Sequence, residues 1–281
     1  MRARHATDPQ VRVEHIWGTA ITLDLRDNGE PDRADAVFAW FRRVDDLFST
    51  WRPESEISRL GRGELAGDDA SPEIHAVLAL CDRVKDESSG AFDVRFGADP
   101  RVARREGFGA IDPSGLVKGW ALQRAAEQLR ATGSENFAIN AGGDVLVAGR
   151  PAPGTNWRVG IQHPWQRDKL AMVLTGSDVG VATSGRYERG DHIIDPDTGM
   201  PATDLMSVTV VAEDLALADG YATAALVMGA DGPPWLAEHG LAAATISNDG
   251  IVTTTRWLRD HRLAETDDGG LIRAGVELTG T

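Results

Sequence analysis

The amino-acid sequence predicts an α+β protein in which mixed or antiparallel sheets pack against helices. Helical and strand-like segments both occur, but they lack the regular βαβ alternation of a doubly wound sheet. Asn248-Asp249-Gly250 separates two short β-type runs, which is a strong signal for a hairpin. The 281 residues could form one large domain or two small ones. Because no repeat or linker divides them, we expect a single domain over residues 1–281.

The chain is expected to open with a strand and a helix. Residues 11–25 have the composition of a strand, interrupted at Gly18-Thr19. Residues 28–51 are typical of a helix, because Pro31 suits a first turn and apolar residues then recur at helical spacing. These apolar residues are Val37, Phe41, Val44 and Phe48. Their shared face is expected to pack on a sheet.

Two more helices are expected before the midpoint of the chain. One covers residues 72–87, and the other begins after Asp112-Pro113-Ser114-Gly115 and continues through Leu129. Cys81 lies on the apolar side of the first. A reactive thiol needs an exposed, electropositive setting, so we interpret Cys81 as a core residue. Since it is the only cysteine, an internal disulfide and a multi-cysteine zinc site are excluded.

The second half of the chain is rich in expected strands. A long helix is predicted over residues 215–229, and the tail from about residue 265, rich in glycine and acidic residues, is expected to be mobile. The expected strands are residues 137–139, 145–148, 157–161, 170–174 and 207–212, followed by the hairpin of residues 243–247 and 251–255.

The charge balance limits the classes of partner. With 29 basic and 43 acidic residues the formal net charge is −14, which repels nucleic acid and anionic lipid. An anionic ligand would therefore need a metal ion or local positive groups. No apolar stretch approaches the roughly 20 residues of a membrane span, and the N-terminus lacks the apolar core of a signal peptide. We expect a cytoplasmic protein without membrane insertion.

Asp219 and Thr223 are the first candidates for metal ligands. They lie four residues apart and hence on one face of the predicted helix. A carboxylate and a hydroxyl are hard oxygen ligands that suit Mg²⁺. They could instead form a polar patch on an exposed helix. However, this helix is apolar nearly all round and is expected to be buried, and a buried carboxylate needs a partner or a metal.

His192 is the candidate general base. A lone histidine is more often structural, but His192 lies between a glycine-containing turn and Asp195-Pro196-Asp197-Thr198-Gly199, where loops commonly carry function. An imidazole with a near-neutral pKa can take a proton beside a metal-bound phosphate. A divalent ion, an imidazole and glycine-rich turns together suggest phosphate chemistry.

Two glycine-containing segments are candidates for ligand contact. Asn140 to Asp144 is either a hairpin turn or a close approach of backbone to a ligand. Lys118 follows the start of a helix whose free N–H groups can face an anion, although an ordinary capped helix with a solvated lysine gives the same pattern. Trp17 and Trp51 could stack on a planar ligand or simply fill the core.

Taken together and in order, these segments resemble the FAD:protein FMN transferase family, the ApbE-like flavin transferases. The matching motifs are W-G-T-A at 17–20, S-T-W-R-P-E-S-E-I-S-R-L at 49–60, S-G-A-F-D at 89–93, D-P-S-G-L-V-K-G-W-A at 112–121, I-N-A-G-G-D at 139–144, A-T-S-G at 182–185, H-I-I-D-P-D-T-G-M-P at 192–201, and S-V-T-V-V-A with A-D-G-Y-A-T-A within 207–224.

The resemblance implies an ApbE-like, T-fold-like architecture and an enzyme that uses Mg²⁺ and FAD. Such enzymes move FMN from FAD onto a threonine hydroxyl of an acceptor protein and release AMP. By the same resemblance Asp219, Thr223 and the Gly115 carbonyl hold the metal, and His192 lies beside the reacting phosphates. Positions expected to line the FAD site are Trp17, Trp51, Ala91, Phe92, Asp93, Asp112, Lys118 and Ile193.

This chain also departs from the family pattern. Many relatives have methionine in place of Trp17, tyrosine in place of Trp51 and asparagine in place of Gly61. Only 18 residues separate Asp93 from Asp112, fewer than usual, and they include Arg95, Arg101, Arg104 and Arg105. Two alternative functions are carried beside transfer. The resemblance also allows FAD hydrolysis to FMN and AMP. The other is flavin binding without catalysis, against which the intact Asp219, Thr223 and His192 argue.

Overall fold

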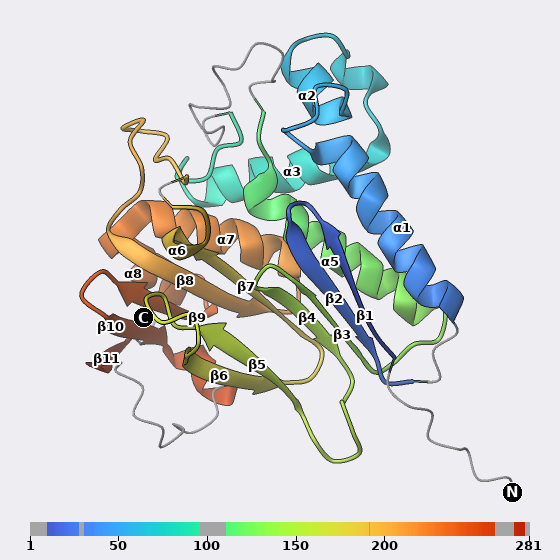
Figure 1. The fold of residues 1–281 in the computed structure, drawn as a ribbon. Coiled ribbons are helices and arrows are strands. Elements are labelled where there is room, and N and C mark those ends of the chain that lie inside the picture. The colour runs from blue at the N-terminus through green and yellow to red at the C-terminus, as the bar shows by residue number, and fades with distance from the viewer. Residues whose placement is uncertain (1–9, 28–30, 96–110, 191, 262–272, 279–281) are drawn as a thin grey trace, which may run out of the picture.

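The computed structural model describes residues 10–27, 31–95, 111–190, 192–261 and 273–278. Within these residues the chain folds into a large sheet, a separate two-stranded sheet and a set of helices (Figure 1). This arrangement confirms the predicted α+β class. Most of the Arg-rich segment between Asp93 and Asp112, including Arg101, Arg104 and Arg105, lies outside the described residues.

The large sheet has nine strands in the order β1-β2-β3-β4-β7-β8-β9-β10-β11. All neighbours pair antiparallel except β10 and β11, which are parallel. Its strands are β1 Gln10–Ile16, β2 Thr19–Leu25, β3 Phe137–Ala141, β4 Asp144–Ala148, β7 Val179–Gly185, β8 Leu205–Ala212, β9 Ala242–Ser247, β10 Ile251–Thr255 and β11 Arg273–Leu278. The two-stranded sheet consists of β5 Trp157–Gln162 and β6 Leu170–Gly176.

Four long helices pack together (Figure 1). They are α1 Pro31–Phe48, α3 Pro72–Glu87, α5 Ser114–Ala131 and α7 Leu215–Met228. Among them, α1, α5 and α7 also contact the large sheet. The short helices are α2 Glu56–Gly61, α6 Arg186–Arg189 and α8 Gly232–Glu238, with 3₁₀ segments at η1 Gly67–Asp69, η2 Gly229–Asp231 and η3 Arg256–His261.

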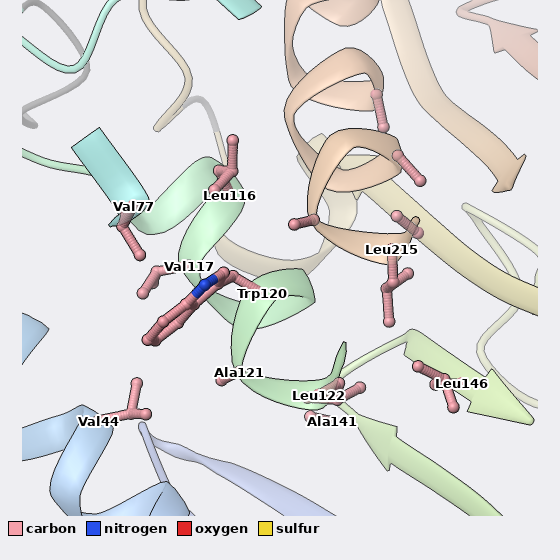
Figure 2. Packing of buried hydrophobic residues seen from close by; sticks show 14 of the residues in the cluster. Val44, Val77, Leu116, Val117, Trp120, Ala121, Leu122, Ala141, Leu146 and Leu215 are labelled. Atoms are coloured by element: carbon pink, nitrogen blue, oxygen red, sulfur yellow. The ribbon is translucent and has the colours of Figure 1, made fainter. Parts of the chain in front are cut away.

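Helix α5 lies at the centre of the main core. It contacts α1, α3, α7, β3 and β4, which explains why nine of its residues are buried. Figure 2 shows Trp120 extending from α5 toward Val44 of α1, while Leu122 lies near Ala141 at the end of β3. The Trp120 ring also packs against Trp40 and Phe48, with ring centroids 5.4 and 5.6 Å away. Packing from several sides fixes the position of the N-terminal turn of α5.

The predicted burial of α7 and of Cys81 is confirmed. Ten of the fourteen residues of α7 are buried, including Asp219, which is 3% exposed. Cys81 is 1% exposed, and burial, the largest influence, raises the pKa of its thiol far above the ordinary value. The thiol is therefore a core group and not a nucleophile.

The expectation of one interrupted strand over residues 11–25 is wrong. The chain reverses at Trp17 and Gly18, whose φ angles of 58° and 71° both lie in the left-handed region. This conformation joins β1 and β2 as a two-residue hairpin with twist matching the strands. Tryptophan rarely adopts positive φ, so the sequence did not indicate a turn at this position.

Two strands were not expected from the sequence. Strand β7 lies at the centre of the large sheet between β4 and β8, although its segment was treated only as a motif leading into a glycine turn. Strand β11 pairs with β10, so residues 273–278 of the tail belong to the sheet rather than to a mobile end. Asn140 to Asp144 is the β3–β4 hairpin turn, with positive φ at both Gly142 and Gly143.

Candidate active site

A cavity of about 1110 Å³ opens beside the N-terminal turn of α5. It is lined by segments from α5, α7, β7, the β1–β2 turn and the loops around residues 49–51, 91–93 and 192–194. All twelve site residues expected from the sequence line it: Trp17, Trp51, Ala91, Phe92, Asp93, Asp112, Gly115, Lys118, His192, Ile193, Asp219 and Thr223. The fold thus brings them together, while what each one binds stays a prediction.

Asp219 reaches the cavity from a buried position on α7. Its Oδ2 accepts a hydrogen bond of 3.0 Å from the backbone N–H of Gly119. This contact requires α5 and α7 to approach closely, and a Cβ atom at position 119 would lie only 2.4 Å from the Leu215 carbonyl oxygen. Glycine at position 119 therefore allows the two helices to meet and holds the Asp219 carboxylate at the wall.

Thr223 lies one helical turn beyond Asp219 and completes a group of oxygen atoms. Its hydroxyl donates to the carbonyl oxygen of Gly115 at 3.3 Å and lies 2.9 Å from the Ser184 hydroxyl. Because the carbonyl can only accept, the Ser184 hydroxyl is the donor to Thr223 in this chain of bonds. A carboxylate, a hydroxyl and a carbonyl thus face one part of the cavity.

This donor set fits a hard divalent cation. The described residues contain no cluster of three or more His, Cys, Asp or Glu side chains suited to a metal. A site here would rest on one carboxylate and two neutral oxygens, with further ligands supplied by water or a substrate. Mg²⁺ is commonly bound in this way, through one or two carboxylates plus substrate phosphates.

Lys118 supplies positive charge to the cavity wall. It follows Gly115 by one turn of α5, and its ammonium forms an ion pair with Asp144 at the start of β4. Asp144 is fully buried and its other carboxylate oxygen accepts from the backbone N–H of Thr183 at 3.1 Å. The Lys118 ammonium is therefore held at the cavity wall by a carboxylate from strand β4.

Asp93 and Asp112 border the cavity with defined partners. Lys85 lies 2.6 Å from the Asp93 carboxylate, and the backbone N–H of Arg95 donates to it at 2.9 Å. Burial opposes ionisation of Asp93, but these two contacts outweigh it and lower the pKa of the carboxyl group. Asp112 Oδ1 accepts from the N–H of Ser114 at 3.0 Å, at the start of α5.

A backbone contact of His192 shows which of its two ring nitrogens carries a proton. Its Nδ1 lies 2.9 Å from the carbonyl oxygen of Gly190. A carbonyl oxygen can only accept, so Nδ1 carries a proton, and whenever the ring is neutral Nε2 is the basic nitrogen. The loop that follows is braced by Asp195, whose carboxylate accepts from the Asp197 N–H and the Thr198 hydroxyl.

Comparison with known proteins now identifies the family. The sequence model of the ApbE family matches residues 17–109 and 98–245. The chain belongs to the ApbE family. Among curated relatives, the FAD:protein FMN transferase of Vibrio cholerae is 28% identical over 91% of this chain and 88% of its own length. That of Rhodobacter capsulatus is 36% identical over 91% of this chain and 58% of its own length.

Solved structures agree on the fold. The flavin transferase ApbE from Vibrio cholerae aligns with a TM-score of 0.78 over 90% of this chain and 99% of its own, at 23% identity. The ApbE protein from Thermotoga maritima aligns with a TM-score of 0.80 over 92% of this chain and 100% of its own, at 22% identity. The predictions of an ApbE-like fold and of flavin transferase family membership are both confirmed.

The two aromatic residues predicted at the ApbE site lie differently. Trp51 is 59% exposed at the rim. Trp17 is partly buried, with its ring edge-on to Phe41 at a centroid distance of 5.2 Å. Its indole N–H is buried without a hydrogen-bond partner in the described part of the protein. Strained backbone and an unpaired donor at one residue are typical of functional positions, where they persist because the surroundings enforce them.

Several residues that line the cavity were not individually expected from the sequence. Ser184 stood within a quoted motif, and its small hydroxyl carried no separate signal. Gln162 and Arg167 come from the β5–β6 hairpin, which had no motif at all. Among the described residues, no helix combines the length and the apolar character needed to cross a membrane.

Proposed function

We propose that this protein transfers FMN from FAD to a threonine hydroxyl of an acceptor protein, with Mg²⁺ as cofactor and AMP as the second product. The observation that carries the proposal is the convergence, on one cavity, of the oxygen group at Asp219, the cation at Lys118 and the imidazole of His192. Relatives that match nearly the whole chain are named FAD:protein FMN transferase, which supports the same reaction.

Asp219, Thr223 and the Gly115 carbonyl are the residues that would hold Mg²⁺. When bound, the ion would neutralise charge on the pyrophosphate of FAD as AMP leaves. The donor chemistry supports this role, since the three oxygen atoms come from adjoining turns of two packed helices. On a chain with a net charge of −14, local cations are needed to hold a dianionic pyrophosphate.

His192 is the proposed general base. Its Nδ1–H bond to Gly190 leaves Nε2 as the atom that accepts the proton of the incoming threonine hydroxyl. The hydroxyl oxygen then attacks the phosphorus of the FMN half, the bond to the AMP phosphate breaks, and AMP leaves. Such base catalysis typically contributes about 10²–10⁴ in rate.

The remaining lining residues would bind and orient FAD. Trp17 and Phe92 offer apolar surface in the interior of the cavity, and Trp51 offers a ring face at its rim. Asp93, Asp112 and Ile193 would contact polar and apolar parts of the dinucleotide. Loss of water from FAD on these walls would strengthen the electrostatic contacts to its phosphates.

Hydrolysis of FAD to FMN and AMP is the second candidate. The groups are the same, with water replacing threonine as the nucleophile. The exposure of Trp51, 59%, supports this candidate because it leaves the rim on that side accessible to solvent. The two functions differ only in whether a threonine hydroxyl or a water molecule gives its proton to His192 and attacks the phosphorus.

One assay separates the candidates. The protein is incubated with FAD and Mg²⁺, with and without a threonine-containing acceptor protein from the same cell, and AMP is measured by chromatography. Covalent flavin fluorescence on the acceptor establishes transfer, whereas AMP and free FMN without acceptor establish hydrolysis. If no AMP forms in either reaction, only flavin binding is left. A cytoplasmic location stays a prediction from the sequence, which fractionation of cells tests.

A further inference from the structure

Asp144 is a buried charge that the proposed reaction does not use directly. It begins β4, immediately after the Gly142-Gly143 turn, and none of its surface is exposed. A fully buried carboxylate is strongly unfavourable unless it is paired. Its presence beside the cavity therefore needs a structural or functional reason.

The two carboxylate oxygens of Asp144 bind two different walls of the cavity. Oδ2 accepts from the ammonium of Lys118 on α5, and Oδ1 accepts from the backbone N–H of Thr183 on β7 at 3.1 Å. Thr183 directly precedes Ser184, whose hydroxyl contacts Thr223. One buried side chain thus connects the cation of the site to the strand that supports its oxygen group.

Lys118 needs such a connection in order to act at one position. Its four-carbon side chain is flexible, so holding it in one position costs conformational entropy. Only 22% of this side chain is exposed, so the ammonium is held at the wall rather than in solvent. The contact with Asp144 engages an N–H donor of the ammonium and so restricts where the ammonium lies.

We propose that Asp144 is a positioning residue that holds the Lys118 ammonium where the FAD pyrophosphate binds. It does so without touching FAD itself. The proposal rests on the proposed flavin transferase function, because it assigns Lys118 to the phosphates of that substrate. Since the Lys118–Asp144 pair carries no net charge, the contribution of Asp144 is the location of the cation and not an added charge.

The test is a double-mutant cycle on FAD binding. FAD dissociation constants are measured by equilibrium dialysis with Mg²⁺ for the wild type, Asp144→Asn, Lys118→Met and the double variant. Asparagine keeps the size of the side chain and an oxygen for the Thr183 N–H. We expect Asp144→Asn to weaken FAD binding about tenfold, equivalent to about 1.4 kcal/mol. We expect the double variant to match Lys118→Met within about twofold, because Asp144 acts through Lys118.

A matched control and a second variant guard against loss of folding. Asp27→Asn changes a partly buried carboxylate that accepts from Asn136 and Glu135 away from the cavity, and it should leave FAD binding unchanged. Lys118→Arg keeps both the charge and a partner for Asp144 but relocates the donors. If position matters, it weakens FAD binding several-fold while the thermal transition stays near that of the wild type.

The outcomes are distinct. Unchanged FAD binding in Asp144→Asn, multiplicative losses in the double variant, or full affinity in Lys118→Arg would each overturn the positioning role and leave the proposed function standing. Absence of saturable FAD binding by the wild type would overturn the proposed function, and the role of Asp144 with it.

Discussion

Gly119 is the position where a single methyl group is expected to disturb both the fold and the site. A Cβ atom there would lie 2.4 Å from the Leu215 carbonyl oxygen and 2.9 Å from the Asp219 Cβ. The first neighbour is backbone in α7 and cannot rotate away. The Gly119→Ala variant must therefore push α5 and α7 apart, which also lengthens the 3.0 Å bond from the Gly119 N–H to Asp219.

The expected loss of stability follows from three contributions. Overpacking of a core costs about 1–3 kcal/mol, and a hydrogen bond to a charged group contributes about 1.5–3 kcal/mol. Alanine regains about 1 kcal/mol over glycine within a helix. Taking about 2 kcal/mol for each loss, the free energy of unfolding falls by about 3 kcal/mol. At about 2 °C per kcal/mol for a chain of this size, the Tm falls by about 6 °C.

The assay is thermal unfolding followed by circular dichroism, together with Mg²⁺ binding by calorimetry. Gly67→Ala is the matched control, because its Cβ would meet nothing within 4 Å and its φ is not positive. That variant should unfold within about 0.5 kcal/mol of the wild type. A Gly119→Ala protein with wild-type Tm and wild-type Mg²⁺ affinity would refute the argument that this glycine sets the spacing of the helices.

Four further predictions concern single side chains. Asp219→Ala should abolish Mg²⁺-dependent AMP release, and full activity in that variant would contradict the metal assignment. His192→Ala should lower kcat by about 10²–10⁴ with little change in FAD affinity, whereas the reverse pattern would make it a binding residue. Burial and then the Glu87 hydrogen bond raise the pKa of Tyr221 from 10.0 to about 12, so its contribution to stability is complete below pH 10 and is lost as pH rises toward 12. Absorbance titration resolves this, since Tyr187 is the only other tyrosine and Tyr221→Phe should remove the late step. Cys81 should react with a thiol reagent only on unfolding, and rapid labelling of the native protein would show that the core opens there.

The parts of the fold that the sequence predicted are those with a strong local signal. Helix α1 and the β9–β10 hairpin carry helical spacing and a turn tripeptide, and both were located within a few residues. Strand β7 was missed because it contains Gly180 and Gly185 and ends in polar residues, a composition that is typical of a loop. Its strand conformation is imposed by β4 and β8 on either side, and such pairing is not visible in a local pattern.

The residues expected at the site all line one cavity, although strands β7 and β11 of the sheet were not expected. These residues occur in short motifs at the ends of elements, so their identity survives errors in the assignment of neighbouring strands. Some side chains that line the cavity belong to no motif, such as Gln162 and Arg167 of the β5–β6 hairpin. Their place at the cavity depends on how that hairpin packs over the sheet. No property of these two residues in the sequence indicates that they reach the cavity.

The contact between α5 and α7 depends on two residue pairs whose spacing is visible in the sequence, although the sequence does not show that the pairs face each other. Gly115 and Gly119 are four residues apart, as are Asp219 and Thr223, so each pair lies on one face of its helix. In the structure Gly119 faces Asp219 and Gly115 faces Thr223. Helix α5 supplies the space and the Gly115 carbonyl oxygen, and α7 supplies the Asp219 carboxylate and the Thr223 hydroxyl. Spacing identifies each pair, but only the packing of the two helices matches them, and this match brings the backbone carbonyl of Gly115 to within 3.3 Å of a side-chain hydroxyl.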